Sequence, residues 1–328
     1  MTDRPPRAQG TLFDLPPPRL PLAEGALAHT PLAARLPASI RLGGMTWSYP
    51  GWAGHVYADA LSDKQLAAHG LTAYAQHPLL RLVEIDRTYY EPLSADAFAT
   101  YAAQVPDDFR FVIKAHEDCT VLRFPMHARY GKKRGLANPR YFDPEYAARM
   151  VVEPAARGLG MQLGAILFQL SPEDHGHPEA FAENVFRFLS ALPAGVSYAV
   201  ELRTPALLTR AYGEALAAAR ALHCLSVWTV MPSLLQQARL IPPAARRPLL
   251  VRWLLRKDAR YEDASTRYAP FDRIVDEDLE HRAEIAGLVA KAHAHGVSSL
   301  VLVDNKAEGC AIESIVLLAR ELDALLTR

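Results

Sequence analysis

The chain has 328 residues, with 36 Lys and Arg residues against 36 Asp and Glu residues. Half of its residues are hydrophobic, which excludes a chain that is disordered throughout. The balanced charge excludes a globally basic nucleic-acid binder, although a local basic face is compatible with it. Three widely spaced cysteines argue against a disulfide scaffold, and no apolar run of about 18 residues predicts a membrane span. Because the start of the chain lacks the apolar core of a secretory signal, we expect a cytoplasmic protein.

The first 38 residues contain eight prolines, and we predict that residues 1–38 form a disordered tail. Residues 39–328 are then expected to form a single domain. One part of the tail, with Gln9, Leu12 and Phe13, resembles the Gln-x-x-Leu-Phe peptide by which bacterial DNA-repair and replication proteins bind the sliding clamp. The resemblance implies the bacterial sliding clamp as a partner, since a disordered arm with an apolar pair suits binding in a groove.

From residue 40 onward, short apolar runs of strand length alternate with segments of helical periodicity. Ser62 and Gln65 form a predicted capping box, and Gly296 is placed to end a helix over residues 277–295. The apolar runs are 40–47, 81–86, 109–115, 163–170, 196–203, 223–229, 248–254 and 297–304. Eight such units in about 290 residues predict an α/β protein with a TIM-type (β/α)8 barrel. A doubly wound parallel sheet is the alternative.

Polar residues lie near the end of most of these runs, where barrel enzymes place their chemistry. Side chains two residues apart share one face of a strand, so Glu84, Lys114 and Glu201 are expected at the barrel mouth. We interpret these three as catalytic candidates, with Glu84 or Glu201 as the general base and Lys114 as an electrophilic group. The candidate ligand-binding residues are Trp47, Tyr49, Thr88, Tyr90, His116, Gln169, Arg203, Arg252 and Asn305. A structural ion-pair network is the alternative for any one of them.

Glu84, His116, Glu201 and Asp304 have the ligand atoms that a divalent metal prefers. No local metal-binding motif supports this set, and the nearby Lys114 would repel a cation. The cofactor is therefore unknown, and a divalent metal is a weakly supported alternative.

A long basic segment follows the third run. Residues 119–142 contain no Asp or Glu, and aromatic residues are interleaved with their basic residues. This composition suits a phosphate or single-stranded nucleic acid, whereas a solvated surface loop is the alternative. The candidate residues of this basic loop are Arg123, Arg129, Lys132, Lys133 and Arg134.

Six collinear segments together resemble the YecE-like family, also called domain of unknown function 72. They are GGMTWSYPGWAGHVY (43–57), VEIDRTYY (83–90), FRFVIKA (109–115), LGAILFQLSP (163–172), AVELRT (199–204) and DNKAEGCA (304–311). The resemblance covers roughly residues 40–325 and implies a TIM-type barrel. Two positions depart from the expected pattern. Leu254 and Leu255 stand where we expect His-Gly, and Asp304 stands where we expect Asn.

Three functions are compatible with these features. The first is an enzyme of the hydrolase or isomerase/lyase type that binds a small anionic or phosphate-bearing ligand at the mouth. In one version of this hypothesis the ligand is nucleic acid and the enzyme acts in repair, which the basic loop and the clamp peptide favour. The second is a non-catalytic module that binds nucleic acid or the sliding clamp. The third is an enzyme for a sugar or sugar acid, with Trp47 and Tyr49 as a stacking wall.

Overall fold

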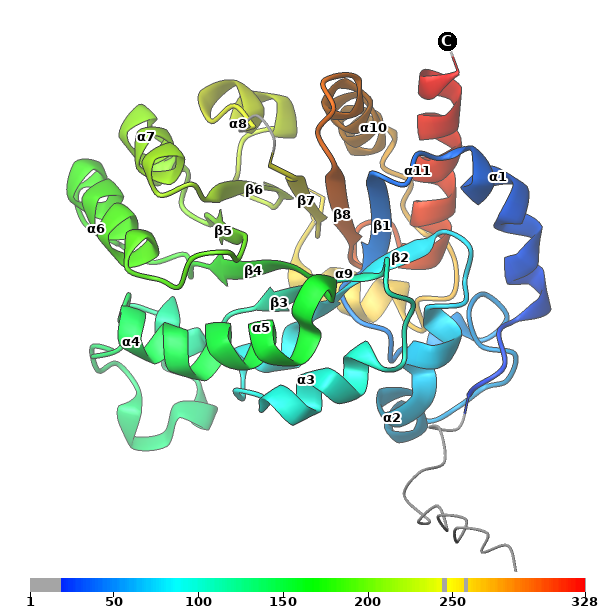
Figure 1. Ribbon diagram of the computed structural model, residues 1–328, viewed down its shortest axis with the longest axis horizontal. Helices are drawn as coiled ribbons and strands as arrows, with labels where there is room; N and C mark the ends of the chain where they lie inside the picture. The colour runs from blue at the N-terminus through cyan, green and yellow to red at the C-terminus, as the bar shows by residue number, and fades with distance from the viewer. Residues whose placement is uncertain (1–18, 244–246, 257–258, 328) are drawn as a thin grey trace, which may run out of the picture.

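Eight parallel strands form a closed barrel in which each strand pairs with its neighbours in chain order (Figure 1). The structure is a computed structural model that describes residues 19–243, 247–256 and 259–327. The strands are β1 (Ile40–Gly44), β2 (Leu80–Ile85), β3 (Arg110–Lys114), β4 (Leu163–Gln169), β5 (Tyr198–Glu201), β6 (Leu222–Val227), β7 (Leu249–Trp253) and β8 (Ser299–Val303). Each coincides with one predicted apolar run. Pairing of β1 with β8 closes the barrel, so the doubly wound alternative is wrong.

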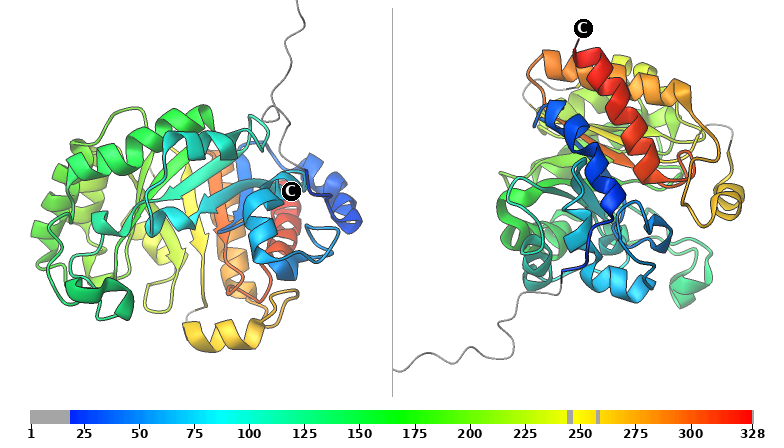
Figure 2. Two further views of the ribbon diagram at one scale, coloured as in Figure 1. Left: turned by 90° about the horizontal axis from the view of Figure 1, so that it is seen from below. Right: turned by 90° about the vertical axis from the view of Figure 1, so that its right-hand side faces the viewer.

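Helices surround the barrel on its outside (Figures 1 and 2). They are α2 (Asp63–Tyr74), α3 (Ala95–Ala102), α4 (Pro144–Ala147), α5 (Glu153–Leu159), α6 (Pro178–Ser190), α7 (Arg210–Ala218), α8 (Leu234–Leu240), α9 (Tyr261–Tyr268), α10 (Leu279–Ala294) and α11 (Ala311–Leu326). The capping box of Ser62 and Gln65 is present at the start of α2. Gly296 follows α10 with a φ of 69°, a left-handed conformation that glycine adopts readily.

The alternation of side chains along the strands separates two apolar layers. On β2, Val83 and Ile85 pack in the layer between the barrel and the helices, whereas Leu82 packs inside the barrel. Val112, Leu250 and Leu302 also belong to the interior layer. Glu84 is two residues after Leu82 and therefore also points inward, toward the carboxyl end of the barrel. The packed apolar interior forms the base on which the polar mouth rests.

The predicted disordered tail is wrong for residues 19–38. This segment contains the 3-10 helix η1 (Glu24–His29) and α1 (Thr30–Arg35), and α1 lies along α11 (Figures 1 and 2). Leu32 is buried, and Arg35 forms an ion pair of 2.8 Å with Asp323 of α11. Pro31 occupies the first turn of α1, where a missing backbone N–H costs no hydrogen bond. Proline content therefore does not disorder this segment.

The predicted clamp-binding residues Gln9, Leu12 and Phe13 lie outside the described residues. Among the helices that the structure describes, none has the length and apolar character needed to cross a membrane.

Candidate functional site

A cavity of about 650 Å³ opens at the carboxyl ends of the strands. It contains most of the residues that the sequence singles out as ligand-binding or catalytic. Those that line it are Trp47, Tyr49, Glu84, Tyr90, Lys114, Gln169, Arg203, Arg252 and Asn305. They come from seven of the eight strands or the loops that follow them, because parallel strands in a barrel all end at the same rim. We call this space the mouth cavity.

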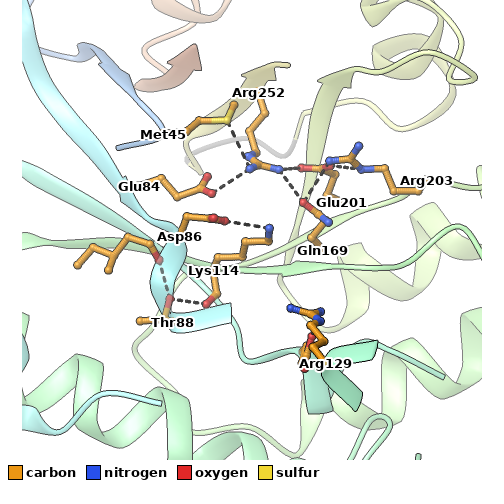
Figure 3. A network of polar contacts seen from close by, with 12 residues as sticks. Met45, Glu84, Asp86, Thr88, Lys114, Arg129, Gln169, Glu201, Arg203 and Arg252 are labelled. Carbon is orange, nitrogen blue, oxygen red and sulfur yellow. Dashed lines mark hydrogen bonds and ion pairs between the residues drawn. The ribbon is translucent and has the colours of Figure 1, made fainter. Parts of the chain in front are cut away.

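Arg252 is the centre of a buried ion network at the base of the mouth cavity (Figure 3). Its Nη2 lies 2.9 Å from Glu84 Oε1, and its Nη1 lies 2.5 Å from Glu201 Oε2. Arg203 Nε lies 2.6 Å from the other oxygen of Glu201. Gln169 Oε1 accepts hydrogen bonds of 3.1 Å from both arginines. One arginine thus pairs with two carboxylates, from β2 and β5, and a second arginine pairs with the other oxygen of Glu201.

The two buried glutamates differ in how fully they are paired. Burial alone would raise the pKa of Glu201, but Arg203 and Arg252 lower it below its ordinary value. Glu84 has only Arg252 as a direct partner, and its Oε2 is buried without a hydrogen bond among the described residues. Burial therefore raises the pKa of Glu84 to about 7, and Asp86 and Glu201 act in the same direction. Glu84 can gain and lose a proton near neutral pH, whereas Glu201 is held as an anion.

Lys114 forms its ion pair with Asp86 and not with Glu84. Its Nζ lies 2.9 Å from Oδ1 of Asp86 and 4.2 Å from the centre of the Tyr89 ring. Lys114 is buried, whereas the Asp86 side chain is 42% exposed. The lysine is thus held at the wall of the cavity by an ion pair that a ligand can reach.

Thr88 and Asn305 have contacts that hold the rim together. The hydroxyl of Thr88 donates 2.6 Å hydrogen bonds to the carbonyls of Ile85 and Lys114, which fixes the 3-10 helix η3 (Asp86–Tyr89) against β3. Thr88 is buried and does not line the mouth cavity. Asn305 Oδ1 accepts hydrogen bonds from Trp52 Nε1 at 3.0 Å and from the Ala311 backbone at 2.9 Å. These bonds attach the β1 loop and α11 to the end of β8.

The predicted aromatic wall is only partly exposed to the cavity. Trp47 is buried and packs edge-on against Tyr101, with the ring centres 5.0 Å apart. Tyr49 is half-buried against Phe271 and lines the cavity. Tyr90 is 57% exposed and is available to a ligand. The aromatic surface that a ligand can contact in the mouth cavity is therefore provided by Tyr49 and Tyr90 more than by Trp47.

His116 and the basic loop lie at a different cavity, of about 770 Å³. His116 Nδ1 lies 2.9 Å from the hydroxyl of Tyr146 and does not line the mouth cavity. Of the basic loop, Arg129, Lys132 and Lys133 line this second cavity, whereas Arg123 and Arg134 do not. Tyr90 lines both cavities, so the two spaces adjoin at its ring.

These positions separate the four side chains considered as metal ligands. His116 lies at the second cavity, and Glu84 and Glu201 are both bound by Arg252. Within residues 19–243, 247–256 and 259–327, no group of three or more His, Cys, Asp or Glu side chains is placed to hold a metal ion.

The mouth cavity is also lined by residues that sequence reasoning did not assign as ligand-binding, among them Trp228, Tyr261 and Lys306. Cζ of Arg203 lies 3.8 Å from the centre of the Trp228 ring, and Nζ of Lys306 lies 4.6 Å from the centre of the Tyr261 ring. Trp228 is two residues after Ser226 and four after Cys224, so strand alternation could have found it. Tyr261 belongs to α9 in the long connection after β7, where no local pattern points to the mouth.

The fold and this cavity define the chain as a (β/α)8-barrel protein with a charged mouth at the carboxyl ends of its strands. A family model described as protein of unknown function DUF72 matches residues 41–327, and the chain therefore belongs to the DUF72 family. The family resemblance noted from the sequence is thus confirmed.

Two solved structures illustrate the shared fold. A DUF72 family protein from Thermotoga maritima is 18% identical with a TM-score of 0.59, and the match covers 88% of this chain and 99% of that one. A DUF72 family protein from Enterococcus faecalis is 19% identical with a TM-score of 0.58, covering 88% and 96% of the two chains. No curated protein matches the chain.

Proposed function

We propose that the chain is an enzyme that binds a small anionic ligand in the mouth cavity and uses Glu84 as its general acid–base group. The observation that carries the proposal is the buried Oε2 of Glu84, which has no hydrogen-bond partner among the described residues. An unpaired buried carboxylate oxygen is costly in a purely structural network. It is useful in a site where a ligand supplies the missing partner.

The protonation behaviour of Glu84 supports this role. A general acid–base group works best when its pKa lies near the working pH, and the pKa of Glu84 is raised to about 7. Arg252 keeps the carboxyl group in one orientation through Oε1, which leaves Oε2 for proton transfer. Glu201 forms ion pairs through both of its oxygens, with Arg203 and Arg252, so we assign it a positioning role.

The charges around the cavity favour an anion as the ligand. Arg87, Lys114, Arg203, Arg252 and Lys306 line it together with the carboxylates of Glu84, Asp86 and Asp304. Glu201 lies behind them, so five cations face four carboxylates, and protonation of Glu84 increases the positive excess. Lys114 and Arg203 are the groups that would stabilise negative charge on the ligand.

The test is a screen of small carboxylates and phosphate esters for turnover, followed by Glu84→Gln on any substrate found. Gln keeps the shape of Glu and an oxygen for Arg252 but cannot transfer a proton. We expect turnover to fall by about 100-fold or more while substrate binding stays within a few-fold. Glu91→Gln removes an exposed carboxylate outside the cavity and should leave turnover unchanged. Full turnover in Glu84→Gln would contradict the proposal, and binding without turnover in the wild type would favour a non-catalytic module.

A further inference from the structure

The second cavity has a large positive excess that its own residues do not neutralise. Its cations are Arg129, Lys132, Lys133, Arg140 and Arg149, and its carboxylates are Glu117 and Asp118. Arg129 pairs with Glu117 at 2.5 Å, and Arg140 pairs with Asp118 at 3.0 Å. Within the described part of the chain, the other three cations form no ion pair. Lys132, Lys133 and Arg149 are therefore available to bind an anion.

The wall of this cavity is a fixed structure. Nδ2 of Asn138 donates hydrogen bonds to the carbonyls of Asp118 at 2.9 Å and Val121 at 2.7 Å. Oε2 of Glu173 accepts hydrogen bonds from two backbone N–H groups of the same loop, at Leu122 and Arg123. Cations held on an anchored loop lose less conformational freedom when they bind a ligand.

The cavity also adjoins the proposed reaction site. Tyr90 lines both cavities, and Cζ of Arg129 lies 4.9 Å from the centre of its ring. Nζ of Lys133 lies 5.2 Å from the centre of the Phe124 ring, which lines the same cavity. A ligand that enters the mouth cavity and passes over Tyr90 reaches the free cations.

We infer that the second cavity binds a phosphate monoester group, which belongs to the same ligand whose other end reaches Glu84. This inference rests on the proposed function and assigns the substrate to phosphorylated small molecules. A phosphate remote from the reacting atoms supplies binding energy that helps to position them. Lys132, Lys133 and Arg149 would bind its oxygens by charge-assisted hydrogen bonds.

A single phosphate group fits these observations better than a nucleic-acid strand. The free cations gather in one cavity, whereas a strand needs cations spaced along a path. The whole chain has a formal net charge of zero, so its net charge does not add to the attraction of a polyanion.

The experiment measures binding of inorganic phosphate by calorimetry to five forms of the full chain: the wild type, two double variants, Glu84→Gln and Arg203→Gln. Lys132→Gln with Lys133→Gln removes two cations that line the cavity. Arg123→Gln with Arg134→Gln removes two cations of the same loop that do not line it, so both double variants change the net charge equally. We expect the first pair to weaken phosphate binding by about tenfold and the second pair by less than twofold. Glu84→Gln should bind phosphate as the wild type does, which keeps this test independent of the acid–base proposal.

Several results would overturn the inference. Absence of phosphate binding to the wild type would do so, as would equal weakening by the two double variants. Loss of phosphate binding in Arg203→Gln with none in Lys132→Gln/Lys133→Gln would place the anion in the mouth cavity instead. Tight, steeply salt-dependent binding of a single-stranded oligonucleotide, weakened equally by both pairs, would identify a nucleic-acid surface.

Discussion

Glu84 and Glu201 show how two carboxyl groups that share one arginine acquire different properties. Both are buried and both accept a hydrogen bond from Arg252. Glu201 gains Arg203 as a second cation, so its pKa falls, whereas the pKa of Glu84 rises because burial outweighs its single partner. Environments that separate the pKa values of neighbouring carboxyl groups are typical of acid–base sites.

The raised pKa of Glu84 predicts a specific dependence of stability on pH. The folded chain holds a proton on Glu84 up to about pH 7, whereas the unfolded chain releases it near the ordinary value of 4.5. Between these values the folded state binds more protons, so a rise in pH destabilises it. Relative to Glu84→Gln, the wild type should lose up to about 3 kcal/mol of unfolding free energy between pH 4.5 and pH 8.

Urea unfolding of both proteins at pH 4.5, 6 and 8 measures this difference. Glu91→Gln changes an exposed carboxylate, and its free energy of unfolding should differ from that of the wild type by the same amount at all three pH values. A constant gap between wild type and Glu84→Gln would mean that the pKa of Glu84 is not raised.

At the scale of elements, α1 is the clearest departure from sequence-based expectation. Eight prolines in the first 38 residues indicate disorder, yet residues 24–35 form two consecutive helices beside α11. Pro31, the one proline of residues 24–35, lies in the first turn of α1, where helices tolerate it, and the buried Leu32 packs against another part of the chain. Contact with α11, nearly 300 residues away, has no signature in the local sequence.

This packing predicts that Leu32→Ala destabilises the whole protein. Leu32 is 8% exposed, and its truncation should cost about 2–3 kcal/mol of unfolding free energy. Leu27→Ala makes the same chemical change at a residue that is 57% exposed and should stay within about 0.5 kcal/mol. Denaturant unfolding measures both. Equal stabilities of the two variants would show that residues 24–35 do not unfold with the barrel.

At the scale of the whole molecule, barrel closure limits how far any one strand can shift. Each strand is hydrogen-bonded on both sides, and β1 and β2 approach closely at Gly43. A Cβ atom added to Gly43 would lie 1.7 Å from the carbonyl oxygen of Leu82. Relief requires movement of backbone rather than of a side chain, and a closed ring resists that movement.

Gly43→Ala should therefore destabilise the barrel by about 3 kcal/mol or more, as measured by thermal and urea unfolding. Gly287→Ala adds the same methyl group within α10, where nothing lies within 4 Å of it. That variant should gain about 0.5–1 kcal/mol, because alanine favours the helix more than glycine does. A neutral Gly43→Ala would show that the strands can separate locally.

The sequence alone determined the number of strands, their order and many of the residues that face the mouth, but not Trp228 or Tyr261. These follow from apolar periodicity and from strand alternation, both of which depend only on neighbours along the chain. It also indicated which charged residues, such as Glu84 and Lys114, would stand at the rim.

Only the tertiary structure decided which charged side chains form ion pairs with one another. Lys114 pairs with Asp86 of the preceding β-segment, whereas Arg252 spans the barrel to join Glu84 and Glu201. It likewise placed His116 at a second cavity and covered α1 with α11. The physical reason is that pairing depends on through-space distance and on burial. Closure of the barrel sets both the distances and the burial. It brings Arg252 next to Glu84 and Glu201, which are more than 50 positions away in the chain.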